Sequence, residues 1–102
     1  MINYEFIGWN NDDGADKVWG MIVLLKPNAQ SNETTYATFW GRRGKKLQSK
    51  VQKFSRWDAQ KLIDSKMNKG YREIYKDDIN NVYPEFEKDL QKTAVWNMLK
   101  AS

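Results

Sequence analysis

Apolar residues in the first half of the chain are grouped into four short segments of strand length. Clusters of Gly, Asn, Asp, Ser and Pro separate the segments and are typical of turns. The pattern predicts strands at residues 2–9, 17–26, 34–41 and 47–54. Turns or polar loops are predicted between them at residues 10–16, at residues 27–33 and around the glycines of residues 41–44.

The faces of these strands follow from the two-residue period of a strand. Residues 17–26 are apolar on both faces, which favours a central, covered strand. On the next strand Tyr36, Thr38 and Trp40 share one face because successive side chains point to opposite sides. The short link that follows favours an antiparallel hairpin. On its second strand Lys50 shares a face with the glutamines two residues away on either side, so this face is half-polar.

A helix is predicted after the fourth strand. Ser55 is a favourable N-cap, and Asp58 three residues later completes an approximate capping box. Gly70 is suited to the left-handed residue that ends a helix. Apolar residues between them recur at helical spacing. The expected buried stripe consists of Ala59, Leu62, Ile63 and Met67.

The last third of the chain is predicted to add a second helix. Residues 71–75 form a short extended segment, residues 76–81 a loop, and Pro84 opens a helix over residues 84–100. The predicted fold class is therefore α+β: a small antiparallel sheet of about four to five strands packed with one helix, plus a C-terminal helix, in a single domain over residues 1–102. The apolar side of that second helix is expected to hold Phe86, Leu90, Ala94, Val95, Met98 and Leu99.

Composition excludes several classes of chemistry. The chain has no Cys and no His, so disulfides, thiol nucleophiles, cysteine-ligated zinc and histidine-based catalysis are ruled out. The acidic residues available for acid–base chemistry, Asp12, Asp13, Asp16, Asp77 and Asp78, fall in turn-like sequence. The cluster at residues 10–16 lacks the final Glu of a calcium loop. We therefore expect no enzyme activity, no metal and no cofactor. No apolar run approaches a membrane span and no signal pattern opens the chain, so a soluble, cytoplasmic protein without membrane contact is expected.

Positive charge is concentrated in one stretch. The net charge is +4, yet residues 42–57 hold seven Lys and Arg and no acidic residue, residues 1–41 have a net charge of −3, and residues 58–102 are neutral. Such a local excess, interleaved with aromatic residues, is typical of a nucleic-acid surface. The candidate nucleic-acid-binding residues are Trp40, Arg42, Arg43, Lys45, Lys46, Lys50, Lys53 and Arg56.

Structural explanations compete with this interpretation. Lysines on a sheet edge also prevent aggregation, Trp40 also suits a sheet core, and the glycines at 41 and 44 suit any tight turn. Charge and pattern leave these alternatives open.

The same stretch carries a family resemblance. Its Trp40-Gly41-Arg42 motif, preceded by aromatic residues, resembles the signature of the WGR domain family. Further elements of the family pattern occur in order over about residues 15–75. They are the opening Asp16-Lys17-Val18-Trp19, a strand ending in Phe54, Ala59 within a helix, and the closing Lys66 with Lys69-Gly70-Tyr71.

The resemblance implies an antiparallel sheet with one helix and a DNA-contacting surface. The family occurs in poly(ADP-ribose) polymerases and in bacterial regulators or stand-alone proteins. By resemblance, Trp40 packs against a terminal nucleotide and Arg42 contacts phosphate or links to another domain. The chain departs from the pattern at Arg43, where the family often has an aliphatic residue, and it lacks the catalytic domain that Arg42 would contact.

Two functions from different classes remain as expectations. The first is a non-enzymatic nucleic-acid-binding module, with DNA ends, nicks or single strands favoured as partners. The alternative is a protein-interaction adaptor of a bacterial or phage system, which uses the basic patch or the C-terminal helix to bind a partner or a second copy. Bare apolar side chains at Val95, Trp96 and Leu99 would favour the alternative.

Overall fold

The computed structural model of this chain describes residues 3–25 and 32–101, and the side chains of residues 3–25 and 32–99. The predicted loop at residues 27–33 lies outside these residues except for its last two positions. Antiparallel pairing joins five strands of the described chain in the order β4-β3-β2-β1-β5. The strands are β1 (Tyr4–Asn10), β2 (Lys17–Leu25), β3 (Glu33–Arg42), β4 (Gln48–Ser55) and β5 (Arg72–Glu73).

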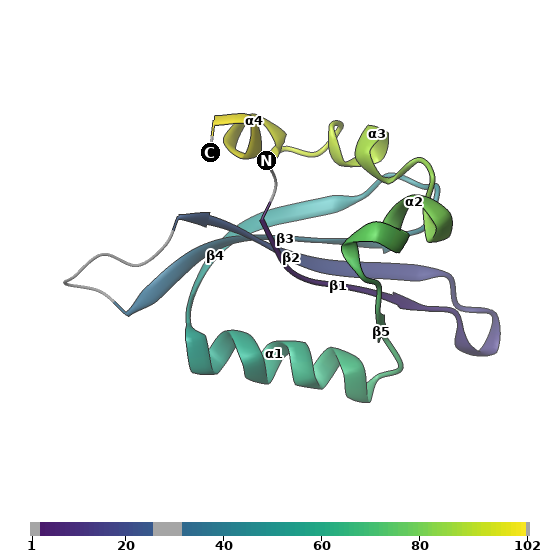
Figure 1. The fold of residues 1–102 in the computed structure, drawn as a ribbon, viewed down its shortest axis with the longest axis horizontal. Helices are drawn as coiled ribbons and strands as arrows, with labels where there is room; N and C mark the ends of the chain where they lie inside the picture. The colour runs from purple at the N-terminus through teal and green to yellow at the C-terminus, as the bar shows by residue number, and fades with distance from the viewer. Residues whose placement is uncertain (1–2, 26–31, 102) are drawn as a thin grey trace.

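The described helices lie on both faces of this sheet (Figure 1). The longest, α1, covers one face, while α2, α3 and α4 cover the other. Their bounds are α1 (Arg56–Asn68), α2 (Ile79–Val82), α3 (Phe86–Leu90) and α4 (Trp96–Ala101), with 3-10 turns η1 (Asp12–Gly14) and η2 (Lys76–Asp78). The α+β class is confirmed, as are the central strand β2 and the hairpin of β3 with β4.

Each face of the sheet has its own apolar core because strand side chains alternate between faces. Phe6, Met21 and Tyr36 lie under α1 and pack with Ala59 and Ile63 of that helix. The residues between them on the strands face α2, α3 and α4. The core on that side includes Ile7, Ile22, Ala37, Phe39, Tyr83, Phe86, Leu90, Val95 and Leu99.

Close packing inside the sheet depends on a glycine of β2. Gly20 lies opposite Phe39 in the β2–β3 ladder, and a Cβ atom added at Gly20 would come within 2.1 Å of the Phe39 ring. The Phe39 ring therefore occupies the space that a side chain at position 20 would fill. This brings Phe39 against Phe86 of α3, with ring centroids 5.3 Å apart.

Helix α1 begins where it was predicted to begin, but the last residue of its predicted buried stripe is exposed. Ser55 is the N-cap, and its side chain accepts a hydrogen bond of 3.1 Å from the backbone N–H of Asp58. Ala59 and Ile63 are buried and Leu62 is half-buried. Met67 is 47% exposed, so its expected burial is wrong.

The predicted C-terminal helix over residues 84–100 is wrong as a single helix. It is divided into α3 and α4, and Pro84 lies in a turn before α3. Tight turns replace the helix between them: both the N–H and the hydroxyl of Thr93 donate to the carbonyl oxygen of Leu90. Such local bonds of Thr compete with helical bonds. The predicted loop at residues 76–81 likewise contains η2 and the start of α2.

The division changes which apolar residues are buried. Leu90, Val95 and Leu99 face the sheet and are at most 5% exposed, whereas Ala94 and Met98 are exposed. A straight helix cannot follow a twisted sheet as closely as two short helices with a turn between them. Among the described helices, none has the length and apolar character required to cross a membrane.

Candidate functional site

The register of the central strands brings aromatic and positive side chains together on the face that carries α1. Trp19 of β2 pairs with Trp40 of β3, and Lys17 pairs with Arg42 two residues further along the ladder. Directly opposed residues of neighbouring strands place their side chains on the same face. Lys50 of β4 joins this face through its pairing with Thr38.

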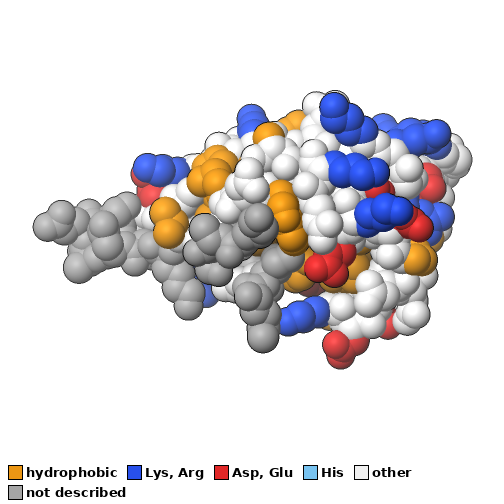
Figure 2. Space-filling view, turned by 90° about the horizontal axis from the view of Figure 1, so that it is seen from above, with side chains coloured by type: hydrophobic (Ala, Val, Ile, Leu, Met, Phe, Trp, Pro, Cys, Tyr) orange, Lys and Arg blue, Asp and Glu red, His pale blue; other side chains and the backbone are white. Residues whose placement is uncertain are grey.

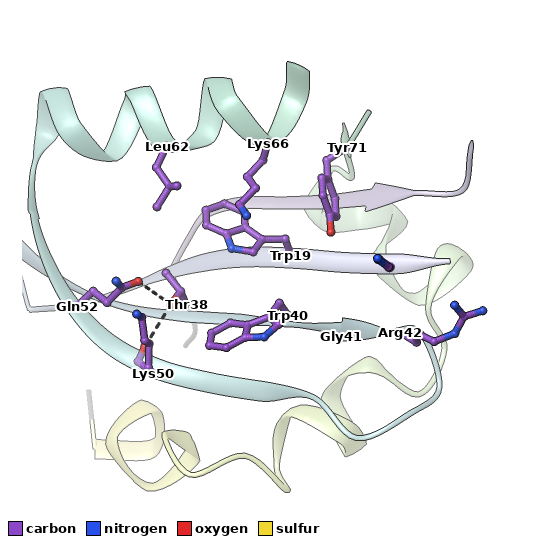
Figure 3. Close-up of a pocket in the computed structure, with 11 residues that line it drawn as sticks. Trp19, Thr38, Trp40, Gly41, Arg42, Lys50, Gln52, Leu62, Lys66 and Tyr71 are labelled. Atoms are coloured by element: carbon purple, nitrogen blue, oxygen red, sulfur yellow. Dashed lines mark hydrogen bonds between the residues drawn. The ribbon is translucent and has the colours of Figure 1, made fainter. Parts of the chain in front are cut away.

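A groove lies between α1 and the part of this face formed by β3 and β4 (Figure 3). It has a volume of about 510 Å³. Leu62 and Lys66 project from α1 on one side, and Lys50 and Gln52 project from β4 on the other. The groove is lined by Lys17, Trp19, Thr38, Trp40, Gly41, Arg42, Lys50, Gln52, Leu62, Lys66 and Tyr71.

The charge of the groove has a single sign. Lys17, Arg42, Lys50 and Lys66 line it, and none of its described lining residues is acidic. Three of these cations are exposed and Lys66 is half-buried. The groove therefore presents a positive potential to any ligand that enters it.

Lys66 is held over an aromatic ring inside this groove. Its Nζ atom lies 5.4 Å from the ring centroid of Trp19, a cation–π distance. Burial, and secondly the positive charge of Lys69, lower the pKa of Lys66 below the ordinary lysine value of 10.5. An anion bound beside Lys66 would offset both effects.

One end of the groove holds an uncharged polar pair, Thr38 and Gln52, beside Lys50. Thr38 is buried at 1% exposure, and its hydroxyl donates a hydrogen bond of 3.0 Å to Oε1 of Gln52. The same hydroxyl lies 3.4 Å from the carbonyl oxygen of Lys50. Figure 3 shows this pair at the end away from Arg42.

Three of the candidate residues predicted from sequence meet in the groove. Trp40 and Lys50 lie side by side in its floor, and Arg42 extends beyond the end of β3 (Figure 3). Trp40 is half-buried, so its ring is neither fully in the core nor free in solvent. Gly41 lets the chain after the turn approach closely, since a Cβ atom there would lie 3.2 Å from the carbonyl oxygen of Lys46.

Arg43 is engaged elsewhere in the fold. Its Nε atom lies 3.1 Å from Oδ1 of Asp16, and its Nη1 atom donates to the carbonyl oxygen of Val82 at 2.6 Å. Its guanidinium carbon lies 4.7 Å from the ring centroid of Trp9, and the indole N–H of Trp9 donates to Asp16. This cluster, which we call the Arg43 clasp (Arg43, Trp9, Asp16 and the Val82 carbonyl), joins the β3–β4 turn to β1, the β1–β2 turn and α2.

The remaining candidates lie around the groove without lining it. Lys45 and Lys46 are exposed in the β3–β4 turn. Lys53 pairs with Thr35 and points to the face opposite Lys50, because the two lysines are an odd number of residues apart. Arg56 begins α1, where it lines a separate cavity.

Sequence reasoning missed most of the groove: it named three of the eleven described lining residues. Lys17 and Trp19 belong to β2, and their place beside Trp40 depends on the strand register. Lys66 and Tyr71 come from α1 and the segment after it. All four lie within the elements that carry the WGR resemblance, and this shared membership is the sequence signal by which they could have been found.

The opposite face of the molecule differs in charge. Figure 2 shows the side that carries α2, α3 and α4, where Lys and Arg side chains lie among Asp and Glu side chains. Val95 and Leu99 are buried there and Trp96 is half-buried. Burial of these side chains weakens the version of the adaptor alternative that uses the C-terminal helix and leaves the version that uses the basic patch untouched.

Within the described residues, no cluster of three or more Asp or Glu side chains is placed to hold a metal ion. Comparison of the chain with family models, with curated proteins and with solved structures finds no match.

Proposed function

We propose that this chain is a non-enzymatic nucleic-acid-binding module that holds DNA at the groove between α1 and the β3–β4 hairpin. One observation carries the proposal. Four Lys and Arg side chains surround two tryptophans and a tyrosine in the groove, and none of the described lining residues is acidic. Positive side chains bind phosphates, and aromatic faces hold bases. Ends, nicks and single strands of DNA are the favoured targets because their bases are open to stacking.

The residues have distinct roles in this proposal. Trp40 stacks against a base or sugar, while Arg42 binds phosphate with its planar, two-pronged group and Lys50 adds a point charge. Lys17 and Lys66, which sequence reasoning left out, complete the phosphate contacts. The WGR resemblance supports the same roles for Trp40 and Arg42, and we propose membership of that family and a bacterial, cytoplasmic setting.

The proposal assigns binding rather than catalysis to the groove. Acid–base and nucleophilic catalysis require a carboxylate, imidazole, thiol or activated hydroxyl placed against a substrate. The described lining residues supply one hydroxyl at Thr38, which is already hydrogen-bonded to Gln52, and the phenol of Tyr71. Burial raises the pKa of Tyr71, which makes that phenol a weaker acid.

Fluorescence anisotropy tests the proposal. The panel consists of blunt duplex, nicked duplex, single-stranded DNA and RNA, each at two salt concentrations. We expect affinity for DNA to fall steeply with salt, as counterion release requires. Trp40→Ala should weaken binding by about 5- to 150-fold, the loss of one stacked base. Arg42→Ala should weaken binding as well and reduce the salt dependence.

Matched substitutions outside the groove control for loss of an aromatic or positive side chain. Trp57 is 72% exposed and does not line the groove, so Trp57→Ala should leave affinity close to that of the unmodified chain. Arg56 lines a separate cavity, so Arg56→Ala is the control for the loss of an arginine in Arg42→Ala. Undetectable or salt-independent binding to every nucleic acid would refute the proposal. Salt-dependent binding to an acidic polypeptide in its place would favour the adaptor alternative.

A further inference from the structure

The groove has a chemical direction along β3 and β4. Lys17 and Arg42 lie at one end, the paired tryptophans Trp19 and Trp40 come next, and Gln52 lies at the other end. Charge and an aromatic surface are thus followed by the polar amide of Gln52, which lies beside Lys50. A nucleotide has the same sequence of parts: a phosphate, a flat ring and a polar base edge.

The polar end is fixed in orientation. The Thr38 hydroxyl carries one proton, and its contact with Gln52 Oε1 is shorter than its contact with the Lys50 carbonyl, 3.0 Å against 3.4 Å. The proton therefore goes to Gln52. Because Thr38 is 1% exposed, its side chain cannot rotate freely into solvent. With Oε1 engaged, the amide of Gln52 offers the groove its Nε2 group, which is a pair of donors.

The size of the groove sets the size of the ligand. Sites for small organic ligands span about 300–1,000 Å³, and the groove, at about 510 Å³, falls within this range. One nucleotide fits such a volume. A base inside a duplex is a poor ligand for Gln52, because its Watson–Crick edge already bonds to the opposite base.

We propose that the groove takes one unpaired nucleotide and that Gln52 selects its base. The phosphate lies toward Lys17 and Arg42, the ring lies against Trp40, and the base edge meets the Gln52 amide. Two N–H donors suit a base whose edge carries an exocyclic carbonyl oxygen, such as thymine, better than adenine, whose exocyclic group at the same position is itself a donor. Thr38 is a positioning residue that sets the amide orientation. This proposal rests on the proposed function, since it assumes that the groove binds nucleic acid.

The test compares affinities of the full chain for single-stranded oligothymidylate and oligoadenylate of equal length. We expect the unmodified chain to prefer oligothymidylate. Gln52→Leu should reduce the ratio of the two affinities by about fivefold or more, the value of one hydrogen bond to a base edge. Its matched control is Gln48→Leu, on the same strand and face but outside the groove, which should keep the ratio.

A second variant keeps the test decisive if Gln52→Leu fails to fold. Thr38→Val preserves the shape of the buried side chain and removes the proton that holds Gln52. It should weaken binding to oligothymidylate more than binding to oligoadenylate and so lower the ratio, whereas a purely structural defect would weaken both alike. Binding by every variant with an unchanged ratio would overturn base selection and leave the proposed function standing. Failure of the unmodified chain to bind either strand would overturn both.

Discussion

Lys66 is a residue whose charge depends on the groove around it. Its ammonium group lies over Trp19, and burial is the larger cause of its lowered pKa, ahead of repulsion from Lys69. A lysine with a lowered pKa loses its proton at a lower pH than a lysine in water. The groove therefore loses one of its four positive charges before the lysines on the surface lose theirs.

This charge loss makes binding sensitive to pH. As pH rises from neutrality toward the ordinary lysine value of 10.5, affinity of the unmodified chain for single-stranded DNA should fall. Lys66→Arg should keep its affinity to higher pH, because arginine stays protonated. Anisotropy titrations over this range, at fixed salt, measure both profiles. The control Lys61→Arg alters a lysine on the exposed side of α1 and should follow the unmodified chain; parallel profiles for all three would contradict the role of Lys66.

Secondary-structure elements are joined by contacts that no local pattern reveals. The alternation around Trp40 predicted that it shares a face with Tyr36 and Thr38. The short link predicted the hairpin, and Ser55 predicted the start of α1. The same reasoning counted Arg43 among the free surface charges. Its partner Val82 is 39 residues away in sequence, so the Arg43 clasp emerges from the folded chain and not from the turn that contains it.

The break between α3 and α4 has a similar origin. Apolar spacing over residues 84–100 fits one helix, yet the twisted sheet buries Leu90, Val95 and Leu99 together only if the chain turns between them. Local pattern thus predicted which residues of this segment are apolar and missed the path of the backbone. For the groove, pattern predicted Trp40, Arg42 and Lys50 of β3 and β4 and missed the residues that β2 and α1 contribute, because strand register and helix placement are tertiary properties.

The Arg43 clasp predicts that a substitution of Arg43 destabilises the fold, although this residue carries a charge at the surface. Arg43→Ala removes the bond to the Val82 carbonyl, the contact with Trp9 and the ion pair with Asp16. We expect the free energy of unfolding to fall by about 1–2 kcal/mol, since the side chain is partly exposed and water screens the ion pair. Urea denaturation measures the change. Lys45→Ala, in the same turn and exposed, should change it by less than about 0.5 kcal/mol, and equal effects would contradict the clasp.

The molecule as a whole is a sheet with two different coverings. On one side α1 leaves part of β3 and β4 open as the groove, while on the other α2, α3 and α4 close over a larger apolar core. Phe86 is central to that second core. Its ring contacts those of Tyr4, Phe39 and Tyr83, with centroids 6.1, 5.3 and 5.6 Å away. The C-terminal segment is therefore part of the domain that supports the groove.

Removing this ring should destabilise the whole domain. Phe86→Ala is expected to lower the free energy of unfolding by about 3–5 kcal/mol, the usual range for a phenylalanine deleted from a core. That is a large share of the stability of a small domain. Thermal or urea unfolding measures the loss, and the exposed Met98→Ala is the control, with little expected change. If both variants unfold like the unmodified chain, the C-terminal segment does not stabilise the sheet.

Strand β4 lies at the edge of the sheet, with β3 on one side only. An open edge invites a strand from another molecule, and lysines on it oppose such pairing. Lys50 and Lys53 point to opposite faces, so both sides of the edge are protected. Lys50 also lines the groove. A substitution that removed the charge of Lys50 would weaken the attraction for an anionic ligand and also the resistance to edge-to-edge association of sheets. Selection on either property therefore constrains the other.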